Sequence, residues 1–373
     1  MASGPRPTLA WPLALALACV VVYASLYPFS QWRDQGLPAL SFLVAPLPRY
    51  WTGFDLAVNV LGYGPLGFLL ALSVMRGPGW PWPVGIATAA AALLSLLMEA
   101  LQGYLPSRVP SNVDFALNAV GAWLGALAAY LLERWGALQR WSEFRRRWFV
   151  GQARGALVLL ALWPPALLFP ASVPFGLGQV LQRLEEELAG LLVGTPFLEW
   201  IPLRDIEPQP LLPGAMVLCV ALGVLVPVLL AYAVVRERWQ RLVALVGALL
   251  AGTAGTALSC ALSFGPDHAW AWFDASTRLG MGLGLLAACW AMLLSARGAI
   301  ALTLLALGVQ LTLLNQAPVD PYLEQTRQVW EQGRFMRFNG LTQWLGWLWP
   351  FAALSYVLLR LSDAPARADG GPP

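Results

Sequence analysis

Residues 111–132 read SNVDFALNAVGAWLGALAAYLL, a stretch in which polar side chains lead into a long apolar run. The run from Phe115 to Leu132 has close to the roughly 20 apolar residues that a membrane-spanning helix needs. Asp114 and Asn118 are four residues apart and therefore share one helix face. A carboxylate and an amide are costly in hydrocarbon unless they have partners, so this face is predicted to point into a helix bundle.

The same pattern occurs once more, at residues 52–62, which read TGFDLAVNVLG. Both copies have a hydroxyl residue, two spacers, an Asp, an Asn four residues later and then a Gly. Asp55 and Asn59 therefore also share a helix face. Between the copies, a third apolar run carries Glu99 and Gln102 near its end, and Arg108 follows in a short connection. We predict that these polar groups converge at one end of three neighbouring spans.

Two interpretations of these residues stay open. Both Asp residues have the spacing of a capping box with the hydroxyl residue before them, although the box prefers Glu. Asn59 and Asn118 could simply form hydrogen bonds that lock helix packing. Glu99 precedes the end of its span and has no capping explanation, and an ionisable group within a span is by default a candidate functional group.

Composition indicates a polytopic membrane protein. Of the 373 residues, 58% are hydrophobic and 12% are charged, and the mean hydropathy is +0.62; soluble domains have about 25% charged residues. The single His excludes a multi-His metal site, and the four Cys stand singly in apolar runs. No phosphate-binding loop or basic–aromatic signature is present. We therefore predict no cofactor, no metal and no nucleic-acid partner, and membrane lipids as the expected partners.

The predicted fold is an all-α transmembrane helical bundle of about ten spans. We assign residues 1–135 to a four-helix module and residues 136–373 to a six-helix module. The spans are predicted at residues 9–29, 54–75, 82–102, 115–132, 155–170, 212–235, 242–264, 279–296, 299–315 and 341–361.

The distribution of Arg predicts the orientation. With both termini in the cytoplasm, 14 of the 23 Arg but only five of the 20 acidic residues face the cytoplasm, as the positive-inside rule requires. The polar cluster then lies at the outer face of a bacterial inner membrane. Amphipathic helices are expected on that face at Leu177–Leu191 and at residues 321–337. Arg145–Arg147 is interpreted as a topology determinant, with binding to anionic lipid as the alternative.

The N-terminal region resembles the VanZ-like family of bacterial membrane proteins, which is named after a protein associated with resistance to the glycopeptide teicoplanin. The resemblance covers roughly residues 10–135, and Gly64 departs from it because the family usually has a larger residue there. It implies a multi-span inner-membrane protein linked to glycopeptide or envelope-stress resistance, with the remaining six spans as a C-terminal extension. The matching elements are Phe54-Asp55, Asn59, Gly64-Pro65-Leu66-Gly67-Phe68, Glu99, Gln102, Pro106, Arg108, Asp114, Asn118 and Gly121.

Three functions fit these residues. The first is binding or handling of an amphiphilic envelope molecule, either a lipid or a lipid-linked compound. The second is a membrane enzyme in which Glu99 is the acid or base, oriented by Gln102, while Arg108 binds an anionic head group. The third is a structural or assembly role without a small-molecule site. The candidate acid–base or binding carboxylates are Glu99, Asp55 and Asp114, and the candidate substrate-binding residues are Asn59, Gln102, Arg108 and Asn118.

Overall fold

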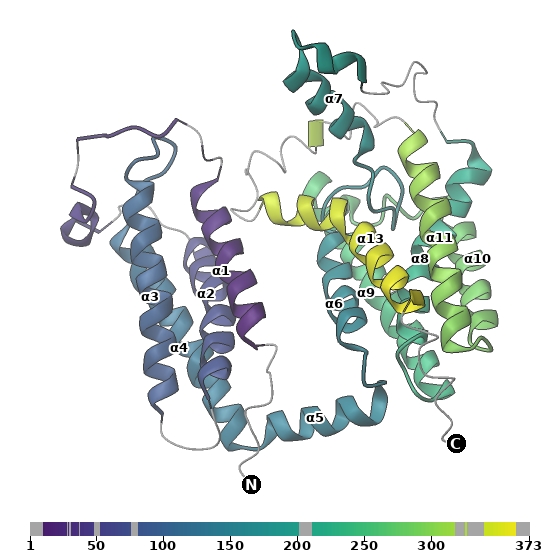
Figure 1. The fold of residues 1–373 in the computed structure, drawn as a ribbon, viewed down its shortest axis with the longest axis horizontal. Coiled ribbons are helices and arrows are strands. Elements are labelled where there is room, and N and C mark those ends of the chain that lie inside the picture. The colour runs from purple at the N-terminus through teal and green to yellow at the C-terminus, as the bar shows by residue number, and fades with distance from the viewer. Residues whose placement is uncertain are drawn as a thin grey trace, which may run out of the picture. The chain divides into compact units, whose positions relative to one another are not determined.

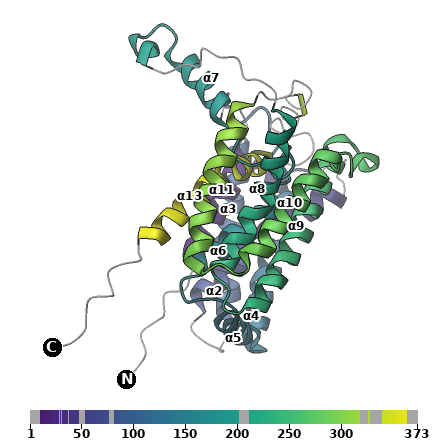
Figure 2. The same ribbon diagram turned by 90° about the vertical axis from the view of Figure 1, so that its right-hand side faces the viewer.

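The computed structural model describes residues 10–27, 29, 31–36, 38–47, 53–75, 81–200, 211–317, 325–326 and 339–362. This part of the chain is all-α, as predicted, and its one β-type contact is an isolated bridge between Phe149 and Val235. Figures 1 and 2 show the helices in two views. They are α1 (Ala10–Leu26), α2 (Gly53–Val74), α3 (Trp82–Gln102), α4 (Asn112–Arg134), α5 (Ala137–Trp148), α6 (Arg154–Ala166), α7 (Leu181–Leu192), α8 (Pro213–Tyr232), α9 (Arg238–Phe264), α10 (Ala275–Ala291), α11 (Ala296–Gln316) and α13 (Asn339–Ser362).

Seven of these helices are long and apolar enough to cross a membrane: α2, α3, α4, α8, α9, α11 and α13. Two further apolar helices, α1 and α6, are shorter. Every predicted span falls on a helix, and α3 has the predicted bounds. The chain is therefore a multi-pass membrane protein, whereas the number of ten spans stays a prediction.

The chain divides into two compact units, Met1–Phe144 and Arg145–Pro373. This division rests on compactness alone, so the predicted boundary between the two helical modules after residue 135 stays a prediction. In the N-terminal unit, helices α1 to α4 pack side by side (Figure 1). The closest packing is between α2 and α4, where glycines let the two backbones touch. A Cβ atom added at Gly67 would lie 2.7 Å from Cα of Ala122, and one at Gly125 would lie 2.7 Å from the carbonyl carbon of Gly64.

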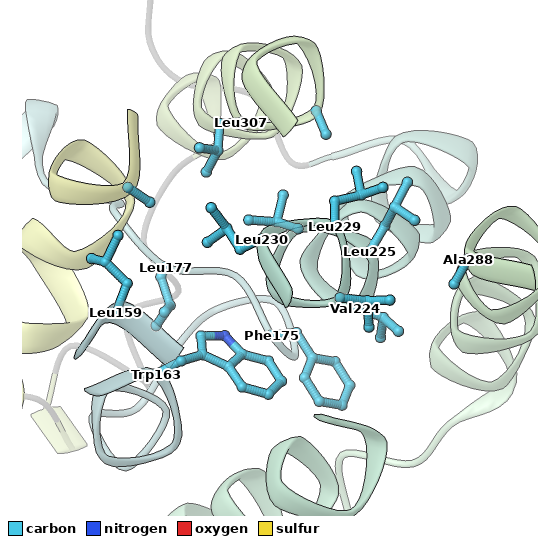
Figure 3. Packing of buried hydrophobic residues seen from close by; sticks show 14 of the residues in the cluster. Leu159, Trp163, Phe175, Leu177, Val224, Leu225, Leu229, Leu230, Ala288 and Leu307 are labelled. Atoms are coloured by element: carbon cyan, nitrogen blue, oxygen red, sulfur yellow. The ribbon is translucent and has the colours of Figure 1, made fainter. Parts of the chain in front are cut away.

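Helix α8 is the central element of the C-terminal unit and packs against α6, α9, α10 and α11. From Gly223 to Tyr232 every residue of α8 is buried. Figure 3 shows Leu225, Leu229 and Leu230 of this helix among side chains from the surrounding elements, including Leu307 of α11. A helix that is apolar on all sides belongs in the interior of a bundle, which is why the segment with the highest mean hydropathy, 2.6, occupies this position.

A buried non-helical segment, residues 167–180, follows α6. Val173, Phe175 and Leu177 are each at most 5% exposed, and Phe175 and Leu177 pack among the core side chains in Figure 3. Its backbone needs internal partners, because irregular backbone is tolerated at membrane depth only where it is buried in protein or lines an aqueous cavity. Asn315 of α11 provides several of them: its Oδ1 accepts from the amides of Val180 and Leu181, both at 3.0 Å, and its Nδ2 donates to a carbonyl of this segment.

The predicted amphipathic helix at residues 177–191 is present as α7, but it begins only at Leu181. The prediction was wrong for Leu177, which lies in the core of the C-terminal unit. The reason is local backbone geometry: Phe175 (φ 61°) and Gly178 (φ 90°) adopt left-handed conformations that cannot continue a helix. Helix α7 extends beyond the ends of α8 and α11 (Figure 2) and exposes an apolar face that includes Leu184 and Leu191. The helix predicted at residues 321–337 lies almost entirely outside the described residues.

Candidate functional site

Polar side chains from three helices meet at one end of the N-terminal unit. Nδ2 of Asn59 in α2 donates to Oδ1 of Asp114 in α4 at 2.8 Å. Oε2 of Glu99 in α3 accepts the backbone N–H of Ser111 at 2.8 Å. Ser111 is the N-cap of α4, and its Oγ accepts the N–H of Asp114 at 3.3 Å. We call Asn59, Glu99, Ser111 and Asp114 the end layer, because one continuous set of hydrogen bonds joins them.

This arrangement gives Glu99 the capping role that its own helix does not provide. In a capping box the third helical residue reaches back to the N–H of the N-cap. Asp114 is the third residue of α4, yet its carboxylate accepts a hydrogen bond from Asn59. The backbone N–H of Ser111 donates instead to Glu99 of the neighbouring helix α3. Our interpretation that Glu99 lacks any capping explanation was therefore wrong. The cap is completed between helices, so it depends on α3 and α4 lying side by side.

A second set of polar groups lies one helical turn further into the bundle. Tyr63, Ser95 and Asn118 stand four residues from Asn59, Glu99 and Asp114, respectively, which is about 6 Å along each helix axis. Nδ2 of Asn118 donates to Oγ of Ser95 at 2.9 Å. The hydroxyl of Tyr63 lies close to Ser95 but makes no hydrogen bond of normal geometry with it. We call these three residues the deep layer.

Two polar atoms of the deep layer have no hydrogen-bond partner among the described residues. They are the Tyr63 hydroxyl and Oδ1 of Asn118, and both side chains are only 6% exposed. A buried donor or acceptor without a partner costs about 1–3 kcal/mol, and buried polar groups normally have one. The Tyr63 hydroxyl and Oδ1 of Asn118 thus keep hydrogen-bonding capacity that no described protein group uses.

Gln102 and Arg108 both form hydrogen bonds with the C-terminal end of α1. Nε2 of Gln102 donates to the carbonyl of Ser25 at 2.9 Å, and Nη2 of Arg108 donates to the carbonyl of Tyr27 at 2.9 Å. The last carbonyls of a helix have no intrahelical partner, so both side chains cap the C-terminal end of α1. The expectation that Gln102 orients Glu99 was wrong, because its amide nitrogen is directed to α1.

The structure thus joins four of the seven predicted site residues in two adjacent layers: Asn59, Glu99, Asp114 and Asn118. Asp55 lies within α2, but its side chain is outside the described residues. Sequence reasoning missed Tyr63 and Ser95. The available signal was spacing, since each stands one turn from a predicted residue on the same helix face.

Residues 11–133 match the family model described as VanZ/LLP1. No curated protein and no solved structure matches the chain. The matched segment includes every residue of the end layer and the deep layer and stops at the C-terminal end of α4. The polar site therefore lies wholly inside the part of the chain that the family describes.

Proposed function

Because residues 11–133 are a VanZ-like region of a multi-pass membrane protein, we propose that this region binds the head group of an amphiphilic envelope molecule. The observation that carries the proposal is the deep layer, with a buried hydroxyl and a buried amide oxygen that have no partner among the described residues. These atoms lie one turn below the buried carboxylate of Glu99. A lipid or lipid-linked molecule can reach such a site from the bilayer while its head group enters among α2, α3 and α4.

The charges of the site favour a head group that donates hydrogen bonds. Glu99 and Asp114 carry carboxylates, which when ionised accept hydrogen bonds but cannot donate them. Nη2 of Arg108 donates to the carbonyls of Ala24 and Tyr27 at the end of α1, so these carbonyls compete with an anionic head group for this cation. Hydroxyl-rich or ammonium-bearing groups satisfy carboxylates, whereas a phosphate close to them is repelled. We therefore propose a sugar-like or amine-bearing head group as the ligand class.

The chain order supports a site on the outer face of the membrane. Helix α4 starts at the end layer and ends at Arg134, so these two ends lie on opposite sides if α4 spans the bilayer. The Arg-rich α5 follows directly, and clustered Arg favours the cytoplasmic side. The end layer then belongs to the opposite, outer side, where envelope molecules are assembled.

A structural role is the second candidate, and the end layer favours it. The bonds from Asn59 to Asp114 and from Ser111 to Glu99 connect three helices. A Gln at position 99 keeps an acceptor for the N–H of Ser111, so a purely structural role predicts that Glu99→Gln is tolerated.

The deciding experiment compares Glu99→Gln with Glu143→Gln in the full-length protein. Glu143 is exposed in α5 and provides the same change of carboxylate to amide away from the site. Native mass spectrometry measures the retention of an uncharged diglucosyl diacylglycerol, and a melting curve in detergent confirms folding. We expect at least tenfold weaker retention for Glu99→Gln, since a hydrogen bond to a charged acceptor contributes about 1.5–3 kcal/mol. Tyr63→Phe should weaken retention less, because it removes one hydroxyl.

Equal retention by the two Glu variants would rule out Glu99 as a binding group and leave the structural role. The same spectra test the enzyme alternative, in which Glu99 is an acid or base, since turnover changes the mass of the glycolipid only with Glu99 present. Teicoplanin sensitivity of cells that carry each variant tests the proposed link to glycopeptide resistance. That link predicts that Glu99→Gln behaves like a deletion and Glu143→Gln like the unaltered protein.

A further inference from the structure

The structure brings together two Arg-rich segments that are about 90 residues apart in the sequence. The isolated bridge joins Phe149 to Val235, and the backbone N–H of Arg236 donates to the carbonyl of Trp148 at 3.0 Å. The rings of Trp148 and Trp239 meet edge to face at 4.9 Å. As a result the end of α5 lies directly beside the turn between α8 and α9. We call the cations of these two segments the basic face: Arg145, Arg146, Arg147, Arg236 and Arg238.

Further helix ends converge on the same side of the C-terminal unit. Arg241 of α9 donates to the carbonyls of Met292 and Leu294 at 2.6 and 2.7 Å, which places the end of α10 there. Arg360 at the end of α13 contacts Gln152 just before α6. Within the described residues of this unit, that end has nine Arg and one acidic residue. The Arg are Arg145, Arg146, Arg147, Arg154, Arg236, Arg238, Arg241, Arg297 and Arg360.

Glu143 of α5, in the other unit, lies one turn from Arg146 and Arg147, and the one acidic residue of this unit at this end is already engaged. Glu237 is the N-cap of α9, and its side chain accepts a backbone N–H in a capping box with Gln240. Like charges held in proximity repel one another, so this end favours an external anion. The opposite end of the unit differs in sign. Its described charged residues are Arg183, Arg278, Glu185, Glu186, Glu187, Asp267 and Asp274.

We propose that the basic face binds the anionic head groups of phospholipids in the adjoining leaflet. Arg146, Arg147 and Arg238 are exposed and can reach phosphates. Trp239 is 58% exposed beside them, and Trp is the residue that anchors proteins at the membrane–water interface. Exposed Arg side chains can bind the phosphates of the head groups, while the adjacent Trp pair lies at the boundary between head groups and acyl chains. This surface belongs to the C-terminal unit and is independent of the polar site proposed above.

The test uses the full-length protein in detergent, titrated with phosphatidylglycerol or with phosphatidylcholine and followed by native mass spectrometry. The Arg146→Gln/Arg147→Gln double variant is compared with Arg33→Gln/Arg278→Gln, which removes two Arg from other parts of the chain. Basic residues near an anionic surface contribute about 1 kcal/mol each. We therefore expect roughly 30-fold weaker phosphatidylglycerol binding in the first double variant, little change in the second, and no effect on phosphatidylcholine.

Arg238→Gln tests whether both segments act as one surface, because it alters the second segment and leaves α5 intact. It should weaken phosphatidylglycerol binding about fivefold. In 1 M salt, phosphatidylglycerol should bind more weakly to the unaltered protein and to each variant that keeps the basic face, since charge interactions are screened at that ionic strength. Equal affinity of the unaltered protein for the two lipids would overturn the proposal. An equal loss of phosphatidylglycerol affinity in the two double variants would also overturn it. Displacement of the lipid by soluble polyglutamate would do so as well, because it would indicate an acidic protein partner.

Discussion

The contact between α2 and α4 makes a strong prediction for Gly67→Ala. A methyl group at Gly67 would lie 2.7 Å from Cα of Ala122 and would overlap the carbonyl of the same residue. The obstacle is the backbone of another helix, so no side chain can rotate away to make room. The two helices must separate locally, which loses contacts in the most extensive helix pair of this unit.

The magnitude follows from two opposing effects. Overpacking of this kind costs about 1–3 kcal/mol, and the upper end applies because rigid backbone is displaced. Ala is a better helix former than Gly by about 1 kcal/mol, which partly offsets the strain. The net expectation for Gly67→Ala is a loss of about 2 kcal/mol in the free energy of unfolding. Gly85→Ala in α3 is the matched control, because a methyl group there meets no atom within 4 Å; it should gain up to about 1 kcal/mol.

The assay is unfolding of both variants in mixed micelles with increasing sodium dodecyl sulfate, followed by circular dichroism and compared with the unaltered protein. Gly125→Ala provides an independent repeat, since its methyl group would meet the backbone of Gly64. Equal stability of Gly67→Ala and Gly85→Ala would refute the reasoning, because it would mean that α2 and α4 do not make backbone contact.

Other perturbations test separate features. Asn118→Leu should lower the free energy of unfolding by roughly 0.6–2 kcal/mol, the scale of hydrogen bonds between membrane helices, and an unchanged midpoint in the same assay would argue against the deep layer as a packing element. Asn315→Leu should cost about 1–3 kcal/mol, because the part-buried amides of Val180 and Leu181 lose their acceptor; Thr312→Val, which alters only a bond within α11, is its control, and equal effects would contradict a role of Asn315 in holding the segment after α6. In a Cys-free background, Arg238→Cys should react with a membrane-impermeant thiol reagent from the cytoplasmic side and Arg278→Cys from the outer side; labelling of both from one side would contradict the predicted topology.

Much of the N-terminal unit could be predicted because its signals are local. Apolar runs set the positions of the helices, and the four-residue spacing of Asp114 and Asn118 fixed which face carries the polar groups. Small residues are typical of contacts between membrane helices, and Gly67 of α2 lies against Ala122 of α4. Ser111 caps α4, as the capping-box spacing predicted.

The partners of the same polar groups could not be predicted. Glu99 and Gln102 share a face of α3, yet Glu99 caps α4 and Gln102 caps α1. Arg108 was expected near the carboxylates, and that stays a prediction, whereas its donation to the carbonyl of Tyr27 after α1 was not foreseen. These pairings depend on how far each helix is rotated and shifted against its neighbours, and no local pattern encodes that rotation.

The sequence by itself determined the membrane class, the helices and the polar faces, because apolar length and the 3.6-residue period act within one segment. Only the tertiary structure decided that Glu99 completes the cap of a neighbouring helix, that residues 167–180 run buried through the C-terminal unit, and that two Arg-rich segments form one face. Each of these joins residues that are far apart in the chain or on different helices. Their physical cause is the need of buried backbone and polar groups for partners, which packing satisfies only once the helices have come together.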